Sequence, residues 1–417
     1  MRPRDPWPWV GLLCATATAS YLARVNVSVA GALLMKEFDL SQAQMGRVFS
    51  AFLLGYALFM VPAGMLADRW GARRTLELAS WWWALATALQ ALVGGAVPGA
   101  GVFSTPGALL GLRFLLGIGE APTFPAAARG VSRWIPPQSQ GRANGLVVAA
   151  IAVGSAIAPP LLSWVMVRWG WRTALAVSAV PSLLTAVAWR IAGEPVPSAA
   201  GIAPESLRTA SGPGSLRTRS FVLLTVSYTL QGYVGYIFVF WFYHYLVQER
   251  HFDFLSGAFF GAMPWLLSIG SIPLGGWLSD RIAASRGLAF GRRAVPLVGL
   301  TLAGLFLSLG ARTTNGVLAA VYLALSTALV LSVEGPFWAT MMEIAGERSG
   351  TGGGIMNTGS NVGGLVSPAL TPVLAQAIGW ENALHVAAVL AVAAGLLWLG
   401  IRPAGERSAA VRQPAVD

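Results

Sequence analysis

Four ionisable residues lie deep inside long apolar stretches of the sequence: Arg24, Arg113, Glu120 and Glu334. In a membrane such a group is costly, and it normally faces a cavity or an oppositely charged partner. A guanidinium stays protonated and offers a planar fork that matches a carboxylate, whereas a glutamate can gain and lose a proton. These residue types predict a site for an organic anion and a proton. For each residue, a purely structural ion pair is the alternative.

Arg24 is the predicted carboxylate anchor. It shares a helix face with Ser28, whereas Asn26 lies on another face, where a neighbouring span would contact it. Glu120 is the predicted proton carrier. An anion that draws Arg24 away from Glu120 would leave a carboxylate with a higher affinity for a proton, so that the two binding events become linked.

Arg113 and Glu120 are seven residues apart, so they share a helix face two turns apart, with Gly117 between them. This separation is too long for a simple i,i+4 ion pair. We therefore expect Glu120 to face a central cavity and Arg113 to contact another span as a structural charge. Gly117 leaves room on this face for a neighbouring helix or a substrate.

Glu334 is followed by Gly335 and Pro336, a pattern that predicts a broken or bent helix with freed backbone groups. Glu334 is a candidate for a second proton-coupling residue. Structural pairing is the alternative, although the sequence does not identify an arginine that would pair with it.

Hydroxyl and amide side chains inside the apolar stretches are candidates for substrate contacts. Tyrosine hydroxyls can bind sugar oxygens, but an asparagine amide in lipid is usually a link between helices. His244, at the outer end of a span, is expected to be interfacial. The predicted substrate contacts are Tyr56, Tyr233, Tyr236, Asn357 and Asn361.

The composition requires that these side chains be positioned by membrane helices. Hydrophobic residues form 55% of the chain and charged residues 11%, against roughly 25% charged in a soluble domain. Apolar stretches of about 20 residues match the bilayer core, and only helices satisfy their backbone there. We expect an all-α integral membrane protein with twelve transmembrane helices, near 9–34, 44–67, 75–97, 105–128, 141–167, 172–192, 220–247, 254–279, 294–311, 315–342, 350–377 and 380–401.

A repeated motif divides the chain into two six-helix pseudo-symmetric bundles. The pattern Gly-x-Leu-x-Asp-Arg begins at Gly64 and again at Gly276, about half of the 417-residue chain apart, which indicates two similar halves. The expected parts are an N-terminal bundle (1–192), a cytoplasmic linker rich in Pro, Ser, Gly and Ala (193–219), a C-terminal bundle (220–402) and a cytoplasmic tail (403–417). The predicted gating and topology charges of the inner surface are Asp68, Arg69, Arg73, Arg74, Asp280 and Arg281.

The net charge of +11 does not indicate nucleic-acid binding, because the arginines lie in short connections between spans. Most basic residues fall on the side of the N-terminus, which predicts that both termini are cytoplasmic. No enzyme signature, Walker loop or metal-binding His or Cys cluster occurs, so neither ATP nor another cofactor is expected. The one cysteine, Cys14, excludes an internal disulfide.

Several segments resemble known transporter motifs. Pro62–Arg74, between spans two and three, resembles the loop signature of the major facilitator superfamily. The chain also resembles the anion:cation symporter family within it, through segments that begin at Arg24 (Arg-Val-Asn-Val-Ser-Val-Ala), Ser50 (Ser-Ala-Phe-Leu-Leu-Gly-Tyr), Arg113 (Arg-Phe-Leu-Leu-Gly-Ile-Gly-Glu-Ala-Pro-Thr-Phe-Pro) and Asn357 (Asn-Thr-Gly-Ser-Asn-Val-Gly-Gly-Leu-Val-Ser-Pro).

This resemblance implies a secondary transporter of sugar acids or other carboxylates, working by alternating access as a monomer in the bacterial inner membrane. Animal relatives carry sialic acid, phosphate or, in vesicles, glutamate. The expected partners are a small organic anion, protons and membrane lipid. One departure is Ala23, where bacterial members often have an aspartate implicated in proton coupling. Proton symport is the first hypothesis. An anion exchanger or a sodium- or potential-driven carrier stays open, and a transporter-like receptor is disfavoured by the short tail after residue 402.

Overall fold

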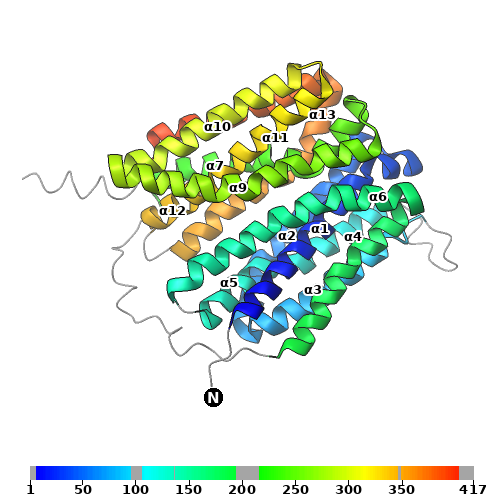
Figure 1. Ribbon diagram of the computed structural model, residues 1–417, viewed down its shortest axis with the longest axis horizontal. Coiled ribbons are helices and arrows are strands. Elements are labelled where there is room, and N and C mark those ends of the chain that lie inside the picture. Colours follow the sequence, from blue (N-terminus) through cyan, green and yellow to red (C-terminus); the bar gives the residue numbers. More distant parts are fainter. Residues whose placement is uncertain (1–5, 95–105, 136, 194–215, 346–348, 403–417) are drawn as a thin grey trace, which may run out of the picture. The chain divides into compact units, whose positions relative to one another are not determined.

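The computed structural model describes residues 6–94, 106–135, 137–193, 216–345 and 349–402, and the chain in these ranges is helical without strands (Figure 1). The elements are α1 (Trp7–Phe38), α2 (Gln42–Trp70), α3 (Ala72–Gln90), α4 (Pro106–Glu120), α5 (Thr123–Trp134), α6 (Pro137–Ala192), α7 (Arg219–Phe240), α8 (Phe242–His244), the π-helix η3 (Tyr245–Glu249), α9 (Phe254–Arg286), α10 (Leu288–Arg312), α11 (Gly316–Ser332), α12 (Glu334–Ala345), α13 (Ser349–Leu397) and the 3-10 turn η4 (Trp398–Gly400).

Eight helices within the described ranges are long and apolar enough to cross a membrane. Two of them, α6 and α13, each contain two predicted spans that are joined at Gly170 and Gly379. These glycines have φ of 82° and 83°, a conformation in which a side chain would be strained. Helix α3 and the pair α4–α5 supply the other two predicted spans, so the described helices account for all twelve.

Two spans are broken. Helix α11 ends at Ser332 and α12 begins at Glu334, as the Glu-Gly-Pro sequence predicts. The fourth span, expected to run continuously over 105–128, is instead divided between α4 and α5, with Ala121 and Pro122 between them. This break places Glu120 at the end of a helix.

The described helices form two compact units. The first is formed by the described residues within Met1–Pro204, Val239–Leu266 and Pro368–Val373, and the second by those within Glu205–Phe238, Leu267–Ser367 and Leu374–Asp417. Aromatic packing joins Val239–Leu266 to the first unit, since the Phe240 ring stacks on Phe49 with centroids 5.1 Å apart. The predicted domain limits at 192 and 220 stay a prediction, and the predicted linker and tail lie mostly outside the described residues.

Glycines allow close helix packing inside each unit. In the first unit, a Cβ added to Gly117 of α4 would lie 2.0 Å from the Phe52 carbonyl oxygen of α2, and one on Gly154 of α6 would lie 2.4 Å from the Thr18 carbonyl oxygen of α1. In the second unit, a Cβ on Gly363 of α13 would lie 2.1 Å from the Thr229 carbonyl oxygen of α7. The contact of α4 with α2 brings the charged face of α4 into the interior of the first unit.

Candidate functional site: a buried arginine–glutamate pair

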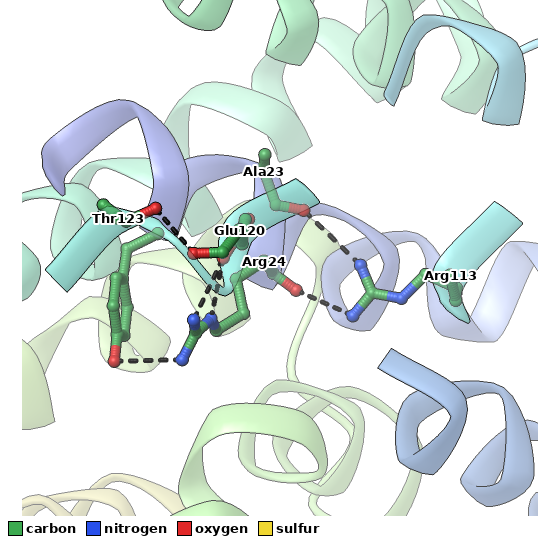
Figure 2. Close-up of polar contacts among 6 residues, drawn as sticks. Ala23, Arg24, Arg113, Glu120 and Thr123 are labelled. Carbon is green, nitrogen blue, oxygen red and sulfur yellow. Dashed lines mark hydrogen bonds and ion pairs between the residues drawn. The ribbon is translucent and has the colours of Figure 1, made fainter. Parts of the chain in front are cut away.

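The first unit contains an ion pair between Arg24 of α1 and Glu120 of α4. Both Nε and a terminal nitrogen of Arg24 donate to the same carboxylate oxygen, Oε2, at 3.2 and 3.0 Å. The two side chains are 2% and 0% exposed, so the pair is shielded from bulk solvent. Figure 2 shows the two side chains meeting between their helices.

The second carboxylate oxygen of Glu120, Oε1, has no hydrogen-bond partner among the described residues. A buried acceptor without a partner is unfavourable, so the carboxyl group is only half satisfied by Arg24. The same oxygen is free to take a proton without breaking any hydrogen bond.

Aromatic side chains surround the Arg24 guanidinium. Its carbon lies 4.3 Å from the ring centre of Tyr21 and 4.8 Å from the ring centres of both Phe52 and Tyr56. The Tyr21 hydroxyl accepts a hydrogen bond from Arg24 at 3.1 Å. Cation–π contacts of this kind favour a cation in an otherwise apolar pocket, and the rings fix the position of the guanidinium while leaving it charged.

Arg113 does not pair with Glu120, although both belong to α4. Its terminal nitrogens donate to the backbone carbonyl oxygens of Arg24, at 3.1 Å, and of Ala23, at 3.5 Å, as Figure 2 shows. The Arg113 guanidinium also lies 4.9 Å from the Phe52 ring centre. Arg113 therefore holds the backbone that carries Arg24, and this contact with another span agrees with the geometry expected from the seven-residue spacing.

The helix break fixes the backbone at Glu120. Thr123, the first residue of α5, donates its hydroxyl to the Glu120 carbonyl oxygen at 2.7 Å (Figure 2). This hydrogen bond ties the end of α4 to the start of α5.

Two other polar residues of α1, Asn26 and Ser28, form hydrogen bonds inside the first unit. The Asn26 amide donates to the Ser178 hydroxyl of α6 at 2.9 Å, which places Asn26 against a neighbouring helix. The Ser28 hydroxyl donates to the Val25 carbonyl oxygen of its own helix at 2.7 Å. Asn26 thus links helices, whereas Arg24 forms the ion pair with the acidic residue.

The second unit holds Glu334 at the break between α11 and α12. Its carboxylate accepts hydrogen bonds from the Tyr228 hydroxyl at 2.8 Å and from the Gln231 amide at 3.0 Å, both on α7. No ion pair to Glu334 occurs among the residues described. The arginine partner that structural pairing would require is absent from this part of the chain.

The remaining predicted substrate contacts divide between the two units. Tyr56 lies beside Arg24 in the first unit, whereas Tyr233 and Tyr236 lie on α7 and Asn357 and Asn361 on α13 in the second. The Asn361 amide donates to the Asn357 carbonyl oxygen of its own helix at 2.9 Å. Their roles in binding stay predictions.

The predicted gating charges lie at helix ends. Arg73 donates to the carbonyl oxygens of Trp189 and Arg190 at 3.0 and 2.9 Å, and Asp280 pairs with Arg292 at 2.5 Å. The Asp68 side chain lies outside the described part of the chain. Three further predicted charges complete the set: Arg69 is exposed, Arg74 lies 5.8 Å from the Trp70 ring centre, and Arg281 lies 5.1 Å from the Trp277 ring centre.

Sequence reasoning missed the residues that support the charged groups. Tyr21 and Phe52 contact Arg24, Tyr228 and Gln231 bind Glu334, and Arg292 joins Asp280 to Glu343. A partial signal existed for Tyr21, which precedes Arg24 by nearly one helical turn. Within the described residues, no group of three or more His, Cys, Asp or Glu side chains is arranged to hold a metal ion.

Comparisons with known proteins give relatives over nearly the whole chain. The model of the Major Facilitator Superfamily matches residues 13–368. The chain is 32% identical over 385 residues to the probable sulfoacetate transporter of Cupriavidus necator, covering 89% of this chain and 87% of that protein. It is 27% identical to the hexuronate transporter of Bacillus subtilis, covering 95% and 94% of the two chains. It is also 27% identical to the D-galactonate transporter of Escherichia coli, covering 92% of each.

Solved structures share the fold. A bacterial homologue of the human lysosomal transporter Spinster, in an inward-facing and occupied conformation, superposes with a TM-score of 0.79 at 19% identity, covering 95% of this chain and 97% of that one. A D-xylose–proton symporter gives a TM-score of 0.72 at 14% identity, covering 95% and 98%. The chain therefore has the twelve-helix, two-domain fold, and it belongs to the major facilitator superfamily as a multi-pass membrane transporter rather than an enzyme.

Proposed function

We propose that this transporter carries a carboxylated organic anion of the sugar-acid class and couples its movement to protons through Glu120. The observation that carries the proposal is the buried ion pair of Arg24 with Glu120. The names of the relatives, which include hexuronate, D-galactonate and sulfoacetate transporters, support an acidic substrate.

Arg24 is the anchor for the acid group of the substrate. Two of its hydrogen bonds end on Glu120 Oε2. An incoming carboxylate competes for the same fork, because a guanidinium binds carboxylates in a bidentate geometry. Arg113 is less suited to this role, since both of its terminal nitrogens already donate to backbone carbonyl oxygens. Of these two buried arginines, Arg24 therefore offers the guanidinium fork, which fits one acid group.

Proton coupling follows from the charge balance of the pair. When Arg24 turns to the anion, Glu120 loses the cation that balanced its charge in a buried site, and a proton on Oε1 restores neutrality. Anion and proton then favour each other's binding, and reciprocity is required thermodynamically. Release of the anion returns Arg24 to Glu120 and displaces the proton.

Anion exchange is the second candidate, and Ala23 favours it. The acid often found before the arginine in the family is missing here, so the protein has one carboxylate fewer beside Arg24. If Glu120 stayed ionised throughout the cycle, the carrier would exchange one anion for another without net proton movement. In a sodium- or potential-driven carrier, Arg24 would likewise bind the acid group of the substrate.

The class of anion that binds and the coupling of its transport to protons are tested in separate experiments. A panel of glucuronate, galactonate, glucarate and sulfoacetate in a thermal-shift assay identifies anions that stabilise the protein, because a bound ligand raises stability by mass action. Purified protein in liposomes with an imposed pH gradient then distinguishes uphill uptake from exchange. Stabilisation by none of these acids would contradict the proposed substrate class.

We also propose that the protein lies in the bacterial inner membrane as a monomer with both termini in the cytoplasm. The distribution of arginines among the connections supports this orientation. Tyr56 in the first unit, and Tyr233, Tyr236, Asn357 and Asn361 in the second, are the proposed contacts for substrate hydroxyls. Reporter fusions to each terminus test the orientation.

A further inference from the structure

Glu334 is a carboxyl group inside the second unit that the coupling scheme above does not use. It is the first residue of α12, and Val333 separates it from the end of α11. Its side chain is partly buried and accepts hydrogen bonds from Tyr228 and Gln231. The Trp338 side chain, one turn along α12, also interacts with it. All three partners are neutral.

No charged side chain faces Glu334 from the helices around it, within the residues described. From α9, Gly276 lies against the next residue of α12, Gly335, since its Cα would lie 3.0 Å from a Cβ added there. From α7 the titratable group in contact is Tyr228, and Tyr236 lies further along the same helix. The other glutamate of α12, Glu343, pairs with Arg292 at 2.8 Å.

This environment differs from that of Glu120. Arg24 neutralises Glu120, whereas the charge of Glu334 is met only by hydrogen-bond donors and by the amino end of α12. Donors and a helix N-terminus stabilise the ionised form, while burial away from water opposes it. The opposing effects keep both charge states accessible.

The neighbours of Glu334 also accommodate the protonated form. A hydroxyl both donates and accepts, so Tyr228 can donate to the carboxylate or accept from the carboxylic acid. Gln231 donates as well to the Val330 carbonyl oxygen at 3.1 Å, so its amide stays anchored when the carboxyl changes charge. The cluster can gain or lose one proton without a large rearrangement.

We propose that Glu334, held by Tyr228 and Gln231, is a second proton-binding carboxyl of this transporter and adds one proton to those moved per anion. The inference rests on the proposed function in that it requires an anion-transport cycle. Its chemistry is one reversible step, in which the carboxylate takes a proton to become a carboxylic acid and later returns it. Glu334 would supply the second carboxyl group that is missing because position 23 is an alanine.

The first test is the reversal potential in proteoliposomes with set anion and pH gradients. Glu334→Gln should lower the proton-to-anion ratio by one relative to the wild type, and the net charge moved per cycle should fall by one unit. Glu381→Gln is the matched control, since Glu381 is a glutamate of the same unit that is 58% exposed and lies beside His385. An unchanged ratio in Glu334→Gln would overturn the inference.

A second measurement needs no transport and keeps the inference testable if Glu334→Gln folds poorly. Infrared difference spectra of the purified protein at varied pH report the carbonyl stretch of a protonated carboxyl. The wild type should show such a band. In Tyr228→Phe the band should shift, because the carboxyl group loses one hydrogen bond. In Glu334→Gln, where this variant folds, the band should be missing. A band unaffected by Tyr228→Phe, or no band, would contradict the proposal. If none of the tested anions bound the wild type, the proposed function would be rejected. The infrared band of Glu334 would still be expected, so the two failures can be told apart.

Discussion

Arg24 donates two hydrogen bonds to one oxygen of Glu120, Oε2, and leaves Oε1 of the same carboxylate without a partner among the described residues. The pair is neutral as a whole, which is how a membrane interior tolerates two charges. Removing either partner leaves a buried charge that must be balanced in another way. An anion and a proton together provide that balance, because one replaces Glu120 as the partner of Arg24 and the other neutralises Glu120.

Arg24→Ala is expected to abolish binding of the organic anion. Loss of one partner of a buried charge pair costs about 2–5 kcal/mol, which corresponds to a Kd weaker by about 30-fold or more. Arg24→Lys should also lose binding, because a point charge does not reproduce the planar fork. The measurement is the thermal shift with glucuronate. Arg172→Lys is the control, since Arg172 pairs with Glu37 at 2.5 Å elsewhere in the unit. Wild-type affinity in either Arg24 variant would remove Arg24 from the site.

Glu120→Gln should reduce proton-driven accumulation while leaving anion exchange intact. Glutamine keeps an oxygen that accepts from Arg24 but has no proton to gain, so it mimics the neutral acid. Anion binding and anion exchange should persist, while uptake driven by a pH gradient should move one proton fewer per anion and reach a lower accumulation. Glu37→Gln provides the control, because it also alters a glutamate paired with an arginine in the first unit. Undiminished uphill uptake in Glu120→Gln would show that the proton binds elsewhere.

Arg113→Ala should destabilise the protein and weaken anion binding together. The variant loses two hydrogen bonds to carbonyl oxygens of α1 and leaves a cavity at a side chain that is 0% exposed, at a cost of about 3 kcal/mol or more. Arg24 then loses the support that positions its backbone. Saturating anion should still raise the melting temperature, with a higher concentration needed. Complete loss of the anion-induced shift in a folded Arg113→Ala protein would instead indicate direct contact with the substrate.

Gly117→Ala should prevent normal folding of the first unit. The added Cβ would lie 2.0 Å from the Phe52 carbonyl oxygen, which is backbone and cannot move aside. Gly111→Ala, on the same helix, meets no atom within 4 Å and should fold normally. The yield of monodisperse protein after detergent extraction measures the difference. Equal yields for the two variants would show that α2 and α4 are not packed so closely.

Local sequence predicts the helices but not every interruption. The apolar stretches locate all twelve spans, because each must match the bilayer thickness. Pro336 correctly indicates the break before α12, yet the break at Pro122 was not expected. Proline alone is not decisive, since Pro159 and Pro160 remain inside α6. Whether a proline ends a helix depends on the neighbours that satisfy the freed backbone groups, and these neighbours are set by the packing of the helices.

The sequence predicts which residues form the candidate site, but it does not predict which of them contact one another. Arg24 and Glu120 stand out because charges in apolar stretches are rare, but their pairing across 96 residues depends on how α1 packs beside α4. The contacts of Arg113 with carbonyl oxygens leave no trace in the sequence, because every residue has a carbonyl. The aromatic rings that contact Arg24 could not be identified from the sequence either, because an apolar chain contains many aromatic residues.

Proton uptake on anion binding tests the coupling of Arg24 and Glu120 most directly. Glucuronate, or the acid that stabilises the protein best, is added to purified protein in weakly buffered detergent with a pH-indicator dye, over a range of pH. The wild type should take up close to one proton more per bound anion than Glu120→Gln, and Glu37→Gln should behave like the wild type. Anion binding by the wild type with no proton uptake at any pH, or equal uptake by Glu120→Gln, would contradict coupling through this pair.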